Sequence, residues 1–176
     1  MEEIDILDEN GNKLNDIRTI EEIHKLGLWH RAVVVLIINS KGKILVQQRA
    51  GTKVFFPNAW EMCLTGHVDA GELSIDTAIR EIGEEVGLRI SKKDLSYIYS
   101  FRREYFAEGS IERLFFDVFC AKTNFDENDV KIQKEEVQAF KLINLNELKE
   151  MIDNGLVHTD NETNILIELM EKGVLC

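Results

Sequence analysis

Proline, cysteine and long apolar runs are all scarce in this sequence of 176 residues, which contains one proline and three cysteines. The cysteines, at 63, 120 and 176, have no paired or metal-site spacing, so we expect no disulfide framework and a reducing compartment, the cytoplasm. The longest apolar run, 32–38, is far shorter than the roughly 20 residues that cross a bilayer. The N-terminus MEEIDILDENGN lacks the apolar segment of a signal peptide.

Positive charge is scarce as well. Lys and Arg number 21 against 32 Asp and Glu, which gives a net charge of −11. Such an acidic surface repels nucleic-acid backbones and anionic membranes, so we expect neither as a partner. It would also repel a phosphorylated small molecule unless cations lie in the site, which is a first indication of metal ions.

The chain shows no repeat and no Pro/Gly/Ser-rich linker, so we expect one domain over residues 1–176, with a small hairpin and helix extension at about 1–27. Strands are predicted at 31–39, 43–48, 60–64, 95–106, 111–121 and 137–143, and helices at 74–86, 144–153 and after a capping box at 159–162. The first two of these strands are expected to pair as a hairpin. Mixed strands with few helices favour an α+β fold arranged as an α/β/α sandwich.

Three glutamates stand together on the helix predicted to start at a Ser74 cap. Glu81, Glu84 and Glu85 have the spacing i, i+3 and i+4, so their side chains project from one patch of the helix. Like charges at this spacing repel, and the negative end of the helix dipole adds to the cost. Hard divalent cations such as Mg²⁺ need such converging carboxylates. A solvated acidic face is the alternative.

The segment around these glutamates, GHVDAGELSIDTAIREIGEEVGL at 66–88, resembles the signature of the Nudix hydrolase superfamily at every fixed position. The resemblance implies a Nudix-type sandwich with a mixed central sheet and a loop–helix–loop catalytic motif. It also implies a pyrophosphohydrolase that directs water onto a phosphorus of a diphosphate linkage. The substrate would be a small-molecule diphosphate, either a nucleotide or a nucleoside diphosphate derivative.

The resemblance also implies roles for single residues. Glu81, Glu84 and Glu85 would bind Mg²⁺, or Mn²⁺, together with the carbonyl oxygen of Gly66, where glycine lets the backbone approach the metal. Glu72 and Arg80 would form a structural pair that fixes the loop to the helix. Arg80 is therefore counted among the expected catalytic residues.

The general base is open from sequence. Glu81 and Glu85 are the candidates within the signature. Glu108 and Glu112, at the predicted tip of the second hairpin, are the candidates outside it, with simple solvation of a hairpin tip as the alternative. Glu112 is preferred of these two because it begins an apolar strand.

A second resemblance, to the isopentenyl-diphosphate isomerase branch of the superfamily, covers most of residues 1–172. Arg49 and Lys53 match the residues that hold the substrate diphosphate there, although a solvated basic loop is the alternative. His30 and His67 match metal-binding histidines of the isomerases, although a single histidine is more often structural. The isomerase catalytic cysteine is replaced by Thr65, and we expect Cys63 to face the opposite side of its strand.

Three functions therefore stay open: a hydrolase, which the complete signature favours, an isomerase, and a non-catalytic nucleotide-binding module. Trp29, Phe55, Phe56 and Trp60 are candidates for stacking on a ring of the substrate, with core packing as the alternative. Cys63 and Cys120 are expected to be small core residues. A homodimer is plausible.

Overall fold

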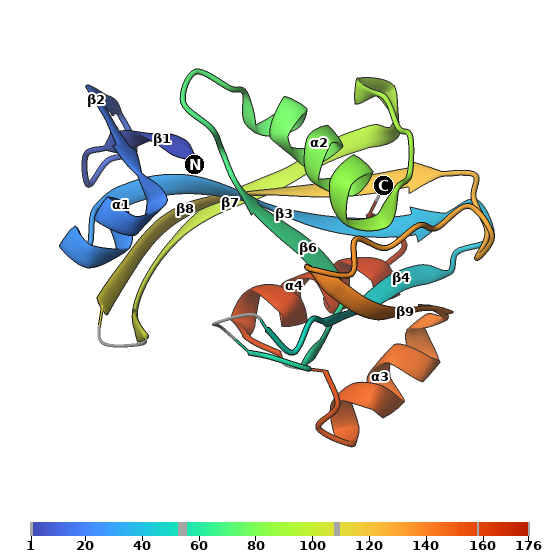
Figure 1. Ribbon diagram of the computed structural model, residues 1–176. Coiled ribbons are helices and arrows are strands. Elements are labelled where there is room, and N and C mark those ends of the chain that lie inside the picture. Colours follow the sequence, from blue (N-terminus) through green and yellow to red (C-terminus); the bar gives the residue numbers. More distant parts are fainter. Residues whose placement is uncertain (1, 53–55, 108–109, 158, 176) are drawn as a thin grey trace.

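A mixed β-sheet with helices on both sides forms the body of the protein (Figure 1), in a computed structural model that describes residues 2–52, 56–107, 110–157 and 159–175. The strands are β1 (Glu3–Leu7), β2 (Lys13–Thr19), β3 (Trp29–Asn39), β4 (Ile44–Arg49), β5 (Trp60–Glu61), β6 (Cys63–His67), β7 (Leu95–Ala107), β8 (Ser110–Thr123) and β9 (Val137–Ile143). The helices are α1 (Ile20–Leu26), α2 (Ser74–Val86), the 3₁₀ turn η1 (Lys92–Asp94), α3 (Leu145–Asp153) and α4 (Asn161–Glu171). The predicted α+β fold is confirmed.

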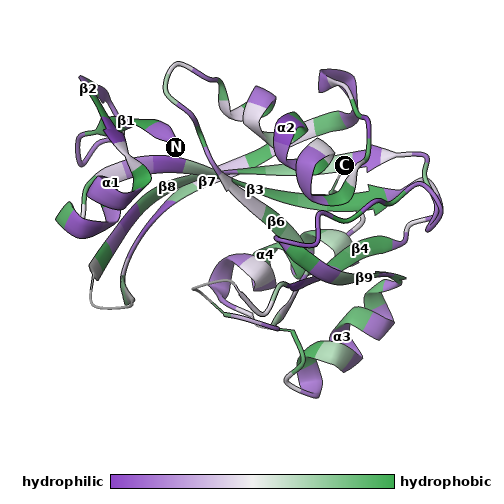
Figure 2. Cartoon of the chain, in the orientation of Figure 1, coloured by the Kyte–Doolittle hydropathy of each residue, from purple (hydrophilic) through white to green (hydrophobic). Residues whose placement is uncertain are grey.

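The long strand β3 separates two hydrophobic cores. Because side chains alternate along a strand, Val33, Val35 and Ile37 pack with α2 residues, whereas Leu36 and Ile38 pack with residues of α3 and α4. The strand is therefore apolar on both faces, which explains the continuous apolar run in the sequence. In Figure 2, β3 is largely hydrophobic where the helices cover it.

The strand pairing differs from the predicted hairpin. β3 and β4 pair at Ile38 and Ile44, and β4 pairs mainly with β9. β3 instead runs antiparallel to β6 over Ala32–Leu36 and parallel to β8 over its full length. The prediction of a β3–β4 hairpin was therefore wrong in extent, because these strands separate soon after the turn and find different partners.

The N-terminal segment forms the predicted hairpin and short helix. β1 and β2 pair antiparallel, Thr19 caps α1 with a capping box, and Gly27 ends it in the left-handed conformation. Ile4 is fully buried, and an isolated bridge joins it to Asp69, which lies two residues after β6. The hairpin is thus attached directly beside the end of β6.

α2 does not begin with the predicted Ser74 cap. Its N-cap is Leu73, whose side chain makes no capping hydrogen bond. The hydroxyl of Ser74 donates to Asp117 on β8 instead, and Asp117 also accepts from Ser100 and from Arg31 at 3.0 Å. Helix α4 has Asp160 as its N-cap, one residue later than a capping box that starts at residue 159 requires. At the start of α2, the tertiary contact of Ser74 with Asp117 therefore replaces the local cap.

The described cysteines differ from each other. Cys63 is a free thiol, and burial raises its pKa far above its usual value. Cys120 is fully buried on β8 but is disulfide-bonded, so the expectation of no disulfide was wrong. Among the described residues, no helix has the length and apolarity to cross a membrane.

Candidate active site

The signature segment brings Gly66 of β6 against Glu81 of α2. A Cβ added at Gly66 would meet the Glu81 carboxyl carbon at less than the 3.0 Å that real Cβ atoms keep. The carboxylate therefore lies directly against the backbone of β6 at Gly66, the residue whose carbonyl the sequence assigned to a metal. Only glycine permits this approach.

Arg80 connects the acidic residues of the site. Its NH1 donates to Glu81 at 2.8 Å and to Glu84 at 3.2 Å. Its NH2 and Nε donate to the two carboxylate oxygens of Glu72, at 3.2 and 3.4 Å, and NH2 also donates to the carbonyl oxygen of His67 at 3.1 Å. The Glu72–Arg80 contact that the sequence predicted is present, and Arg80 also holds the end of β6.

Glu85 contacts a different strand, β4. Its side chain is buried, and its Oε2 accepts from Nε2 of Gln47 on β4 at 3.0 Å. The other amide atom, Gln47 Oε1, is buried without a hydrogen-bond partner among the described residues. A buried acceptor beside a buried carboxylate is suited to a cation or a bound water. Residues of this kind fit a divalent ion that carries several oxygen ligands.

Burial raises the pKa of Glu81 to about 7, because its charged form is desolvated, although Arg80 opposes the shift. Glu84 and Glu2 add smaller repulsive contributions in the same direction as burial. The pKa of Arg80 is raised above its usual value, since the contacts with Glu72 and Glu81 outweigh its desolvation. Without a bound cation, keeping these carboxylates charged and close together therefore lowers the stability of the folded protein.

The predicted diphosphate-binding pair is described only in part. Arg49 lies at the end of β4, where its NH1 donates to Glu61 at 3.1 and 3.4 Å. Its side chain is largely buried, at 14% exposure. Lys53 lies outside the described residues, as does Phe55.

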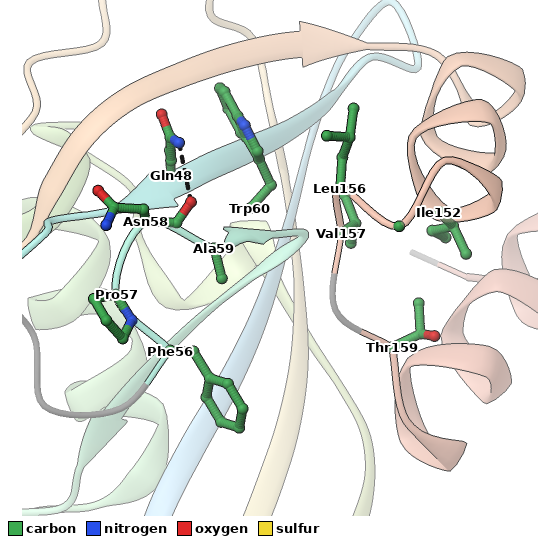
Figure 3. Close-up of a pocket in the computed structure, with 11 residues that line it drawn as sticks. Gln48, Phe56, Pro57, Asn58, Ala59, Trp60, Ile152, Leu156, Val157 and Thr159 are labelled. Carbon is green, nitrogen blue, oxygen red and sulfur yellow. Dashed lines mark hydrogen bonds between the residues drawn. The ribbon is translucent and has the colours of Figure 1, made fainter.

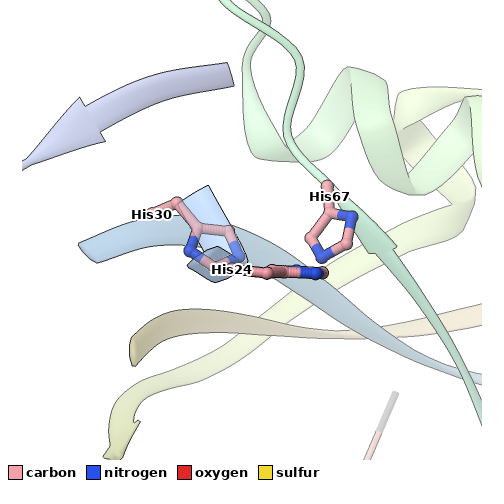
Figure 4. A group of neighbouring side chains, drawn as sticks. All are labelled: His24, His30 and His67. Carbon is pink, nitrogen blue, oxygen red and sulfur yellow. The ribbon is translucent and has the colours of Figure 1, made fainter. Parts of the chain in front are cut away.

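A group of three histidines lies on the other side of β6. His24 of α1, His30 of β3 and His67 of β6 point toward one another (Figure 4), and one ligand atom from each lies within 4.8 Å of the others. Within the described part of the chain, no other group of three or more His, Cys, Asp or Glu residues meets this condition. Gly66 and His67 are adjacent on β6, so one strand contributes to both clusters because its side chains alternate.

A backbone hydrogen bond fixes the orientation of the His30 ring. His30 Nδ1 lies 3.1 Å from the carbonyl of Leu28 and must donate to it, so Nε2 carries the lone pair. That Nε2 is buried without a partner among the described residues. Burial, with a smaller contribution from His67, lowers the pKa of His30 to about 3, which keeps the ring neutral. A neutral imidazole with an unused lone pair fits a metal ion.

Glu112 belongs to this histidine group by position. It is buried on β8, and its Oε2 lies 3.4 Å from Nε2 of His24. The sequence placed it at an exposed hairpin tip, but it lies within β8 at a point where α1 packs against the strand. Glu108, the other candidate base outside the signature, lies outside the described residues.

Thr65, which replaces the isomerase cysteine, lies on β6 with Cys63 on the same face. Their partners on β3 are Val34 and Leu36, two residues apart, and alternation puts such residues on one side of a strand. Cys63 packs in the core that contains Leu36. The expectation that Cys63 faces the opposite side was wrong.

Two of the four candidate aromatic residues line a hollow of about 690 Å³ (Figure 3). Phe56 and Trp60 contribute to one side of it, and Leu156 and Val157, between α3 and α4, contribute to the other. None of the described residues that line it is charged. Trp29 lies elsewhere, with its ring centroid 5.0 Å from that of Phe115 and the two rings tilted by 47°.

The sequence interpretation missed several residues of these clusters. His24 stands alone on a short helix, and Glu2 belongs to an acidic terminus, so neither has a local signal. Gln47 follows three apolar residues of β4 and precedes Gln48 and Arg49, so the sequence does not single it out either.

Comparison with known proteins agrees with this geometry. Residues 28–160 match the NUDIX domain family. An isopentenyl-diphosphate Delta-isomerase of Photorhabdus laumondii is 33% identical, over 88% of this chain and 85% of its own length. A Nudix hydrolase of Listeria monocytogenes is 31% identical, over 88% of this chain and 87% of its own.

The fold has a solved counterpart in a Deinococcus radiodurans protein, with a TM-score of 0.65, 20% identity and coverage of 95% of this chain and 98% of that one. At this identity the likeness concerns the fold alone. The matched family region contains the complete signature of 66–88, and the isomerase branch is represented among the relatives. The chain therefore belongs to the Nudix family, as a Nudix hydrolase of the isomerase-like branch.

Proposed function

We propose that this protein hydrolyses a diphosphate linkage in a nucleotide or nucleoside diphosphate derivative, with the help of Mg²⁺ or Mn²⁺. The observation that supports the proposal is the contact of Glu81 with the backbone at Gly66, the residue whose carbonyl we propose as a further metal ligand. Oxygen ligands of this kind suit hard divalent cations.

The residues divide the work as follows. Glu81, Glu84, Glu85 and the Gly66 carbonyl would hold the cations, and Glu72 with Arg80 keeps α2 fixed to β6. When bound, the cations neutralise the diphosphate and lower the pKa of the attacking water. Glu81 and Glu85 are the candidates for holding the proton of that water, and comparing the pH profiles of Glu81→Gln and Glu85→Gln would identify the base.

Arg49 and Lys53 would hold the diphosphate itself. Arg49 is already paired with Glu61, so a diphosphate has to share the guanidinium with that carboxylate. A planar guanidinium has five donors and can serve two anions. Arg49→Lys keeps the charge but loses the fork, and we expect it to raise KM.

A second cation would occupy the histidine group. Imidazole nitrogens select borderline ions such as Zn²⁺ over Mg²⁺. His24, His30 and His67 have converging rings, and Glu112 adds a carboxylate at 3.4 Å from His24. In this arrangement Glu112 acts on the histidine group and not as the general base of the hydrolysis.

Isomerisation of isopentenyl diphosphate is the second candidate function. It is favoured by the histidine group, in which His30 and His67 match the isomerases, and by the isomerase name of a 33% identical relative. Thr65 in place of the catalytic cysteine opposes it, since proton transfer to an alkene needs an acid in position.

The test is a phosphate-release screen with Mg²⁺ or Mn²⁺ over nucleotides, nucleotide sugars, dinucleoside polyphosphates and isoprenoid diphosphates. Isomer formation is measured in parallel. Release that requires the cation and is lost in Glu85→Gln supports the hydrolase. Isomer formation without phosphate release would replace it, and metal binding without any turnover would indicate a binding module. Light scattering and cell fractionation test the homodimer and cytoplasmic location that we also propose.

A further inference from the structure

The N-terminal segment reaches the histidine group through Glu2. Oε2 of Glu2 lies 3.3 Å from Nδ1 of His67, which is 65 residues away in the sequence. A carboxylate only accepts hydrogen bonds, so Nδ1 of His67 must carry the proton. The lone pair of His67 is then on Nε2, the ring nitrogen that faces His24 and His30 in Figure 4.

The backbone beside Glu2 is held on two sides, so the contact does not depend on a loose terminus. The carbonyl of Glu2 accepts from Ile20 N at 3.3 Å, and the carbonyl of Glu3 accepts from Ala70 N at 2.8 Å. Ile4, two residues on, is fully buried. The segment is therefore fixed to α1 on one side and to the chain just after β6 on the other.

The same arrangement occurs at His30, where Nδ1 donates to the carbonyl of Leu28 and Nε2 is left without a partner. Two rings from different strands thus have Nδ1 bound to an outer oxygen and Nε2 available. Metal-binding histidines show this pattern, because the outer acceptor fixes the tautomer and the orientation of the ring.

We propose that Glu2 is a positioning residue of the histidine site, which fixes His67 with Nε2 toward a bound cation. The inference rests on the proposed function of that site as a metal site. Glu2 does not touch the cation in this account, and it acts through His67. The N-terminal hairpin thereby becomes part of the site.

The expected effect is modest. Outer partners of metal-binding histidines contribute roughly 10- to 100-fold in affinity. The Glu2 side chain is 53% exposed and the contact is long, so solvent screens it. We expect about tenfold weaker binding in Glu2→Ala, with partial recovery in Glu2→Gln, whose amide oxygen also accepts.

Glu3→Ala is the matched control, because it removes the same charge from the neighbouring residue, which is exposed. Co²⁺ affinity is measured by competition with a chromophoric chelator, and the His67 tautomer by long-range ¹H–¹⁵N spectra of the metal-free protein. We expect protonated Nδ1 in the wild type, loss of that preference in Glu2→Ala, and affinity lowered in Glu2→Ala but not in Glu3→Ala.

Equal affinities of Glu2→Ala and Glu3→Ala, a wild-type His67 protonated on Nε2, or no Co²⁺ binding would each overturn the inference. Hydrolysis is tested separately with Mg²⁺ and Glu85→Gln. A protein that hydrolyses no diphosphate but loses Co²⁺ affinity in Glu2→Ala would refute the hydrolase proposal and keep this one.

Discussion

The carboxylate of Glu81 occupies the space that any side chain at Gly66 would need. Gly66→Ala must therefore move Glu81, or separate α2 from β6. We expect hydrolysis to fall at least 100-fold and the protein to lose about 1–3 kcal/mol of stability from overpacking, measured by initial rates and urea unfolding.

Gly83→Ala is the control within the same signature. A Cβ there meets nothing closer than the Leu88 carbonyl oxygen at 4.0 Å, and alanine favours a helix by up to about 1 kcal/mol. It should keep activity and stability. If Gly66→Ala behaves like Gly83→Ala, the close approach has no role in the site.

Glu81→Gln should stabilise the metal-free protein while it lowers activity. The folded-state pKa of Glu81 is raised from 4.5 to about 7. Because the pKa is raised, the stability that Glu81 contributes is fully present below its unfolded-state pKa of 4.5. This stability is lost as pH rises through about 7, by about 3 kcal/mol at most. The amide stays neutral, so at pH 8 we expect Glu81→Gln to unfold at higher urea than wild type, with the difference shrinking toward pH 5. A less stable variant at pH 8 would show that the Arg80 contact outweighs the burial.

Asp117 should be important for stability, because its buried carboxylate accepts from Arg31, Ser74 and Ser100 and joins β3, α2 and β7 to β8. Asp117→Asn loses the charge that these donors share, and we expect a loss of about 2–3 kcal/mol in urea unfolding. Ser100→Ala removes one donor and should lose about 1 kcal/mol. Equal losses in both variants would contradict the central role of Asp117.

Asp160→Ala should weaken the start of α4. Asp160 is partly buried, but hydrogen bonds from Thr163 and Arg103 outweigh that burial and lower its pKa. Because the pKa is lowered, Asp160 stabilises the folded protein at pH values above its unfolded-state pKa. This stability is lost as pH falls through the folded-state pKa. We expect a loss of about 1–2 kcal/mol at pH 7 that disappears in acid. Asp153→Ala, at the exposed end of α3, is the control and should cost nothing.

The elements of the fold were largely predictable, because the apolar patterns of 31–39 and 137–143 and the capping box at Thr19 are local signals. The pairing was not. β3 has apolar side chains on both faces and accepts partners on either edge, so the sequence does not determine whether β4, β6 or β8 lies beside it. The N-cap predicted at Ser74 failed for a similar reason, because the Ser74 hydroxyl donates to Asp117, which is distant in the sequence.

The signature glutamates were predictable because their spacing is fixed on one helix. The histidine group was predictable only in part. His30 and His67 matched a known pattern, but His24, Glu112 and Glu2 reach them from a helix, a hairpin and a terminus. Contacts between such distant segments arise only when the chain folds.

The measurement that tests the central claim most directly is hydrolysis of a diphosphate-linked nucleotide in H₂¹⁸O, with Mg²⁺, with EDTA, and with Glu85→Gln. Water attack on phosphorus predicts one ¹⁸O in a phosphate group of a product, no reaction with EDTA, recovery with added Mg²⁺, and a rate at least 100-fold lower in Glu85→Gln. Undiminished turnover in Glu85→Gln or in EDTA, or ¹⁸O outside the phosphate, would contradict the account.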